Sequence, residues 1–179
     1  HWFLGREVSL KQASIREVLP IPTGDRPEGF LLLVQADYVN RDPAVYSLPV
    51  AFVQDAEADR LLRDSPHLVL ARLIGPGGTG GVLCDALAWP AFSQALLETA
   101  LSRRHGKGAP GRLTGAPTPA LRRLLKEAEP LPPATGTEHE NSLVFFGEKL
   151  VLKLCRRLEA GVNPDLEISR FLLEKGYPH

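Results

Sequence analysis

The chain has 179 residues, of which 44% are hydrophobic and 23% are charged, and its formal net charge is zero. These values are typical of a soluble protein that forms one large domain or two small ones. The balanced charge gives no reason to expect nucleic acid or an acidic membrane as a partner. Because no apolar run reaches the roughly 20 residues of a membrane-crossing helix and the N-terminus lacks a signal core, we expect a cytoplasmic protein.

The first half of the sequence predicts an antiparallel sheet. Apolar or alternating segments are separated by "PTGDRPE", "NRDP" and "GPGGTGG", which carry the Gly, Pro, Asn and Asp residues of tight reversals. We therefore predict a meander of four or five strands. The expected strands are 13–21, 29–39, 44–53, 67–74 and 81–87.

A helix is predicted after the last of these strands. Pro90 stands near its start, apolar residues follow at helical spacing, and two arginines precede Gly106. From Gly106 to Gly136 the sequence is rich in Gly, Pro and Thr, apart from the short helical stretch "TPALRRLLKEAE". We place a boundary here, between a unit of residues 1–108 and a unit of residues 109–179.

The second unit begins with two strands in "HENSLVFFGEKLVLKLCRRL", which reverse at Gly147. A helix then starts with Asn163 as its N-cap and Pro164 at its first position. Gly176 closes this helix, and we expect the sequence to be cut from something longer. The predicted fold class is α+β.

Several local patterns favour a structural interpretation. "GPGGTG" at residues 75–80 has dinucleotide-loop spacing, but a strand follows it and not the helix that such a loop requires. The basic stretch "SRRHGKG" is interpreted as a solvated helix end. Cys84 and Cys155 are interpreted as reduced packing residues, and the five histidines form no metal set.

The run "EKLVLKLCRRL" raises a different possibility, because as a strand it aims Lys153 the same way as Val151 and Cys155. "LVLK" resembles the strand of protein-kinase-like enzymes whose lysine holds the nucleotide phosphates, with Val151 lining the adenine pocket. Glu167, on the following helix, is predicted to reach back to the lysine and fix its position. The alternative is that Lys149 and Lys153 are both solvent-facing strand lysines.

A longer segment carries a family resemblance. "NSLVFFGEKLVLKLCRRLEAGVNPDLEISRFLLEKGYPH", residues 141–179, resembles the corresponding segment of bacterial maltokinases, including those fused to trehalose synthase. "HWFLGREVSL" at the start and "CDALAWPAF" at residues 84–92 are similar to the family's N-terminal and cap segments. The resemblance implies an antiparallel cap domain with a packed helix, followed by the beginning of a kinase-like ATP lobe with an αC-like helix.

The resemblance also implies a function. The complete enzyme would transfer the γ-phosphate of ATP to maltose, giving maltose 1-phosphate, with Mg²⁺ as the metal. Lys153 would bind phosphates, Glu167 would orient it, and Asn141 and Ser142 would lie in the loop over the nucleotide. The sequence contains no H-R-D or D-F-G string, so catalytic residues and metal ligands are expected beyond His179 and this segment is expected to be inactive alone.

Two alternatives remain open from the sequence. A related small-molecule kinase of the aminoglycoside-phosphotransferase kind would use another acceptor. In the other alternative, the first unit is a non-catalytic module that docks the kinase against a fused or separate trehalose synthase.

Overall fold

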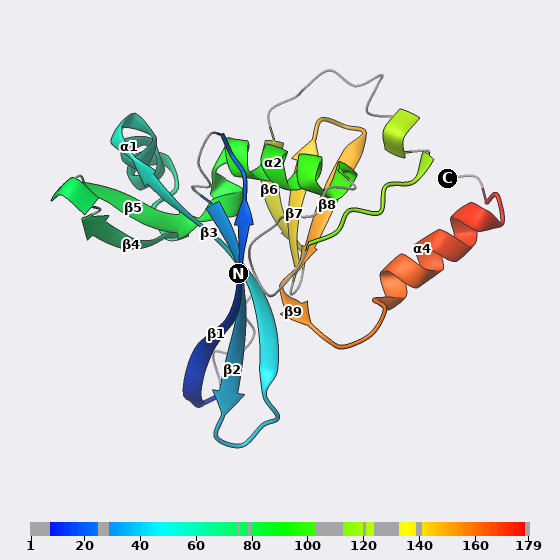
Figure 1. The fold of residues 1–179 in the computed structure, drawn as a ribbon, viewed down its shortest axis with the longest axis horizontal. Coiled ribbons are helices and arrows are strands. Elements are labelled where there is room, and N and C mark those ends of the chain that lie inside the picture. The colour runs from blue at the N-terminus through cyan, green and yellow to red at the C-terminus, as the bar shows by residue number, and fades with distance from the viewer. Residues whose placement is uncertain are drawn as a thin grey trace.

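A computed structural model of the chain describes residues 8–24, 29–74, 76–78, 80–102, 113–119, 121–123, 133–138 and 141–177. The fold is α+β, with a six-stranded and a three-stranded antiparallel sheet (Figure 1). In the part of the chain described, no helix is long and apolar enough to cross a membrane.

The larger sheet contains the strands that the alternating segments predict. They are β1 (Leu10–Ile21), β2 (Gly29–Tyr38), β3 (Ala44–Gln54), β4 (Val69–Ile74) and β5 (Gly80–Asp85). Their order is β1-β2-β3-β5-β4, so β5 and not β4 pairs with β3. The simple meander is therefore wrong at its end, because helix α1 (Asp55–Asp64) and the short turn η2 (Pro66–Leu68) carry the chain to the sheet edge before β4.

The glycine-rich segment forms the reversal between β4 and β5. It contains the short turn η3 (Pro76–Gly78), in which Gly77 and Gly78 have φ angles of 85° and 81°. Such positive angles favour glycine. A strand, β5, follows the turn as predicted, whereas a dinucleotide loop would be followed by a helix.

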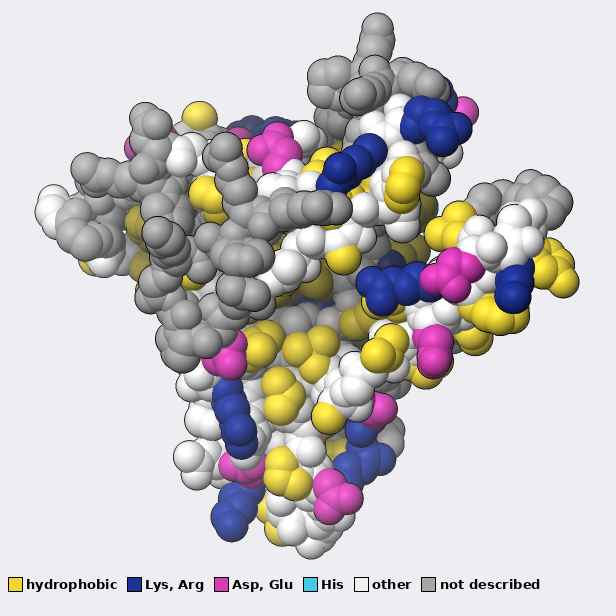
Figure 2. All heavy atoms as spheres, turned by 45° about the vertical axis from the view of Figure 1, so that its right-hand side comes forward, with side chains coloured by type: hydrophobic (Ala, Val, Ile, Leu, Met, Phe, Trp, Pro, Cys, Tyr) yellow, Lys and Arg dark blue, Asp and Glu magenta, His cyan; other side chains and the backbone are white. Residues whose placement is uncertain are grey.

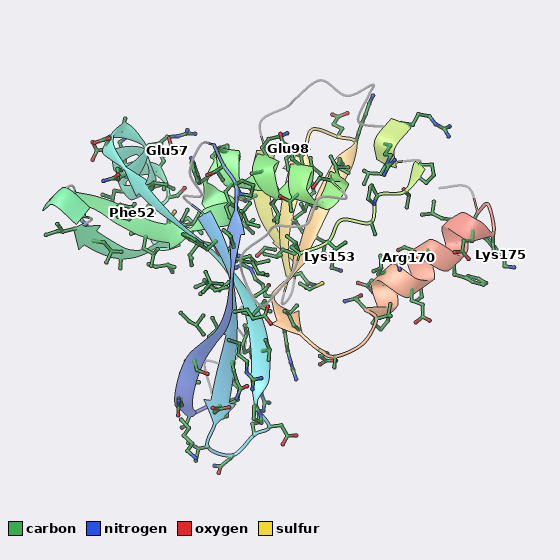
Figure 3. All side chains as sticks on the ribbon, in the orientation of Figure 1. Phe52, Glu57, Glu98, Lys153, Arg170 and Lys175 are labelled. Carbon is green, nitrogen blue, oxygen red and sulfur yellow. The ribbon has the colours of Figure 1, made fainter. Side chains whose placement is uncertain are left out.

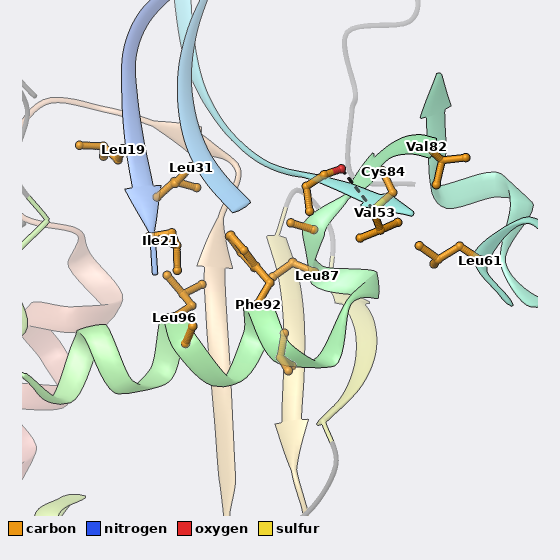
Figure 4. Packing of buried hydrophobic residues seen from close by; sticks show 14 of the residues in the cluster. Leu19, Ile21, Leu31, Val53, Leu61, Val82, Cys84, Leu87, Phe92 and Leu96 are labelled. Atoms are coloured by element: carbon orange, nitrogen blue, oxygen red, sulfur yellow. Dashed lines mark hydrogen bonds between the residues drawn. The ribbon is translucent and has the colours of Figure 1, made fainter. Parts of the chain in front are cut away.

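The chain then passes through η4 (Ala86–Ala88) into helix α2 (Pro90–Leu101), which begins at the predicted proline. Figure 1 shows α2 running across the middle of the molecule, between β1–β3 and the second sheet, and it contacts both β1 and β6. Phe92 and its neighbours on α2 belong to the central cluster of buried residues, which also contains Ile21, Leu31 and Ala51, and Figure 4 shows part of this cluster. Residues 119 and 121–123 are helical, Thr118 precedes them, and residues 120 and 124–129 of the predicted stretch lie outside the described residues.

The three-stranded sheet has the order β6-β7-β8, with β6 (Pro133–Glu138), β7 (Asn141–Phe146) and β8 (Leu150–Cys155). The reversal at Gly147 is confirmed, and this residue has a φ of 60°. One side of the sheet is buried, since Val144 belongs to the same cluster as Phe92, and Leu152 and Leu154 pack against that cluster. Residues on both sides of the predicted boundary thus share one core.

After β8 the chain returns to the larger sheet. The two-residue strand β9 (Arg157–Leu158) pairs with Val45 and Tyr46 of β3. Helix α4 (Pro164–Glu174) follows and lies apart from both sheets at the right of Figure 1. Its predicted start is confirmed, because the Asn163 side chain accepts a hydrogen bond of 2.9 Å from the Asp165 backbone N–H.

Candidate functional site: the open face of the three-stranded sheet

The second sheet has one buried and one open face, and Lys153 lies on the open one. Figure 2 shows the molecular surface on the side of α4. Side chains along β8 alternate, with Leu152 and Leu154 half-buried and Val151 and Lys153 exposed. Register places Phe145 opposite Val151 and Leu143 opposite Lys153. Because paired residues share a face, the open face presents an apolar strip that ends at an ammonium group.

On β6, the residue beside this apolar strip is a glycine, so the strip carries no side chain there. Gly136 of β6 is paired with Leu143, and a Cβ atom added at Gly136 would lie 3.0 Å from the Phe145 ring. The ring therefore occupies the space that a side chain at this position would need. Val151 is 50% exposed and Phe145 is 37% exposed, so apolar surface is accessible at the centre of the face.

The carboxylate that pairs with Lys153 is Asp165. Lys153 Nζ lies 3.0 Å from Asp165 Oδ2, and the two side chains are 36% and 71% exposed. Figure 3 shows Lys153 on the side of the sheet that faces α4. Asp165 stands in the first turn of α4, where a negative charge also favours the helix dipole.

A second contact ties the start of α4 to the same strand. The Asn163 amide, which caps α4 through its oxygen, donates through Nδ2 to Cys155 Sγ at 3.6 Å. Cys155 follows Lys153 on the same face of β8 and is half-buried. Two side chains at the open face, Lys153 and Cys155, thus hold the first turn of α4 against the end of β8.

The other predicted site residues lie on α4 and β7. Glu167 lies in the first turn of α4, exposed, and its N–H donates to the Asn163 carbonyl oxygen at 3.0 Å. Asn141 is the first residue of β7 and is half-buried, and Ser142 is the second and is buried. Both stand in a strand, and residues 139 and 140, which precede β7, lie outside the described residues.

Ser142 belongs to the buried face, opposite to Lys153. Its register partner is Leu154, and its Oγ accepts a hydrogen bond of 2.9 Å from Arg156 Nε. The position of its side chain therefore gives the predicted nucleotide contact no support. The predicted roles of Glu167, Asn141 and Val151 stay predictions.

Sequence reasoning did not find the buried polar group behind this sheet. Arg156 is buried, and its Nη2 lies 2.6 Å from Asp85 Oδ2 in the first unit. Burial lowers the pKa of the Arg156 guanidinium, and the adjacent Asp85 opposes that shift. The "CRRL" doublet was the available signal, since an arginine next to a buried strand position needs a partner.

No protein-family model matches the chain. In the described ranges, no three His, Cys, Asp or Glu side chains are grouped so that they could hold a metal ion. The open face offers an accessible apolar strip beside a lysine that is paired with a carboxylate, and these features suit a ligand that combines a flat apolar part with negative charge.

Proposed function

We propose that the chain is the front portion of an ATP-dependent sugar kinase of the maltokinase kind. Residues 1–108 would form its cap, and residues 109–179 would supply the first strands and the αC-like helix of its ATP lobe. The observation that carries the proposal is the placement of Lys153 on the open face of β6–β7–β8, paired with a carboxylate at the start of α4.

Two properties of the open face support the proposal that it binds ATP. A nucleotide base needs an accessible apolar surface, and Val151 and Phe145 provide one beside Lys153. The phosphates need a cation of fixed position, and pairing with Asp165 restricts where the Lys153 ammonium can lie. In the proposed enzyme Val151 faces the base, Lys153 binds the phosphates, and Glu167 or Asp165 orients the lysine.

Phosphoryl transfer itself is assigned to residues outside this sequence, because the sequence contains no H-R-D or D-F-G string. Mg²⁺, held by those residues, would neutralise charge on the phosphates. The part of the proposal that this chain can test is therefore nucleotide binding.

Titration with a fluorescent ATP analogue, mant-ATP, tests the role of Lys153. We expect Lys153→Ala to weaken binding by about tenfold or more, since hydrogen bonds to charged groups contribute about 1.5–3 kcal/mol. Lys149→Ala is the matched control, because Lys149 is an exposed lysine in the adjoining turn. An equal loss in both variants, or no binding by the unaltered chain, would reject the proposal.

The acceptor is tested in the full-length enzyme. ADP release should depend on maltose when maltose, other sugars and an aminoglycoside are compared. Activity with another acceptor and none with maltose would instead establish the related small-molecule kinase.

A second candidate function is that the first unit docks the kinase onto trehalose synthase. Exposed apolar residues at both edges of the larger sheet favour it, among them Ile15 on β1 and Ile74 on β4, which is 81% exposed. Ile74→Lys should then reduce co-elution with trehalose synthase in size-exclusion chromatography and leave mant-ATP binding unchanged. Unchanged co-elution of Ile74→Lys and of Ile15→Lys would exclude these edges from docking.

A further inference from the structure

One buried arginine joins three parts of the fold. Arg156 follows β8 directly, and its guanidinium bonds Asp85 Oδ2 at 2.6 Å and Ser142 Oγ at 2.9 Å. Asp85 ends β5 of the larger sheet, whereas Ser142 belongs to β7 of the smaller one. The Arg156 side chain is 2% exposed and that of Asp85 is 11% exposed, so water screens this pair little.

Two hydrogen bonds from Ser47 of β3 hold the same point of the chain. The Ser47 N–H donates to the Arg156 carbonyl oxygen, and the Ser47 hydroxyl donates to the Cys155 carbonyl oxygen, both at 2.7 Å. Asp85 is fixed in turn, because its Oδ1 accepts a hydrogen bond of 3.1 Å from the Leu87 N–H in η4. The end of β8 is thus bonded to β3, β5 and β7 at once.

This anchor lies directly behind the candidate site. Along β8, Leu152 and Leu154 point to the buried face, and Arg156 continues on that side, while Lys153 and Cys155 point to the open face. We infer that Arg156 is a positioning residue for Lys153: Arg156 fixes the end of β8, and with it the backbone from which the Lys153 side chain extends, relative to the larger sheet. The inference rests on the proposed nucleotide role of Lys153.

The exposed contacts on the open face of the sheet fix the position of Lys153 less firmly than the buried Arg156 contacts do. The Lys153–Asp165 pair is solvent-exposed, and such pairs are screened by water and salt and contribute little. A buried guanidinium with two side-chain acceptors has a defined orientation, because its N–H groups form a rigid planar fork. Displacement of a reacting or binding group by about 1 Å can cost about a hundredfold in rate, so such an anchor matters for function.

The test must separate positioning from stability. Arg156→Met with Asp85→Asn removes both charges, so no charge is left buried without its partner, and the amide oxygen introduced at position 85 can still accept from the Leu87 N–H. Leu61→Ala is the matched control, because it opens a cavity in α1 and lowers stability without touching Arg156. Amide hydrogen exchange of residues 151–155 and mant-ATP affinity are measured in each folded variant.

We expect the double variant to exchange the amides of β8 about tenfold faster and to bind mant-ATP about tenfold more weakly, with smaller changes in Leu61→Ala. Unchanged exchange and affinity in the double variant, or changes that Leu61→Ala reproduces at equal stability, would overturn the inference. If the unaltered chain binds no mant-ATP while β8 exchange still responds to Arg156, the proposed function fails and only the anchoring of β8 stands.

Discussion

Removal of the Arg156 side chain alone should be among the most destabilising single changes in this fold. In Arg156→Met the aliphatic part of the side chain is largely replaced, so loss of packing contributes little. The loss of stability therefore comes from two polar groups that lose their partner. Asp85, whose side chain is 11% exposed, loses the guanidinium 2.6 Å away, and the Ser142 hydroxyl loses its hydrogen-bond donor.

The size of the expected loss of stability depends on how deeply the ion pair is buried. Breaking a buried ion pair by removing one partner costs about 3–5 kcal/mol, whereas an exposed pair contributes about 0–1 kcal/mol. For a chain of this length each kcal/mol lowers Tm by about 2–4 °C. We therefore expect Tm to fall by about 6–20 °C in Arg156→Met, and by less than about 4 °C in Asp165→Asn, which breaks the exposed pair with Lys153.

Calorimetry and urea unfolding of the two variants measure the difference. Asp85→Asn combined with Arg156→Met should recover part of the lost stability, because no uncompensated charge is then buried. A decrease in Tm in Arg156→Met no larger than that in Asp165→Asn would refute the reasoning. It would mean that water or movement of the chain stabilises the Asp85 carboxylate in place of the guanidinium.

Three further predictions concern the core, the thiol and the site. Gly29→Ala should destabilise the protein by about 1–3 kcal/mol in urea unfolding, because a Cβ there would overlap the fully buried Phe92 ring, whereas Gly24→Ala, with no atom within 4 Å, should be near neutral. Burial raises the pKa of the Cys84 thiol from 9.0 to about 11, so this thiol is deprotonated at a lower pH in the unfolded chain than in the folded protein. Stability should therefore fall as pH rises from about 9 to about 11, and the slope of the urea midpoint against pH should be smaller in Cys84→Ala; equal slopes would contradict a raised pKa. In mant-ATP titrations, a greater loss of affinity in Glu167→Gln than in Asp165→Asn would identify Glu167 as the carboxylate that orients Lys153 in the nucleotide complex, and the reverse would identify Asp165.

The sequence patterns located most of the larger sheet because each strand alternates or is apolar and ends in turn residues. Helix α1 was missed because it starts at Asp55 directly after β3, with no Gly or Pro between them, and only Ala58 and Leu61 of its residues are buried. Strand β6 was missed because its Pro, Gly and Thr residues have the composition of a loop. Local patterns could not show that it pairs with β7.

In the candidate site, too, local sequence patterns located some features and could not locate others. Alternation along β8 placed Lys153 and Val151 on one face correctly, and the capping signal at Asn163 placed the start of α4. The identity of the carboxylate beside Lys153 depends on how the chain turns between β9 and α4, which spacing alone does not specify. The Arg156–Asp85 pair joins residues 71 positions apart, so the local arginine doublet could not identify Asp85 as the partner.

The short strand β9 has a consequence for any attempt to divide this protein. Because residues 157 and 158 pair with Val45 and Tyr46 of β3, and Val144 belongs to the same buried core as Phe92 of α2, a polypeptide that stops at residue 108 would expose part of the β3 edge and some core residues to water. Such a product should associate with itself. The C-terminal half, separated from its counterpart, would carry the Arg156 charge without Asp85, so co-expression of the two pieces is the arrangement in which both should remain folded.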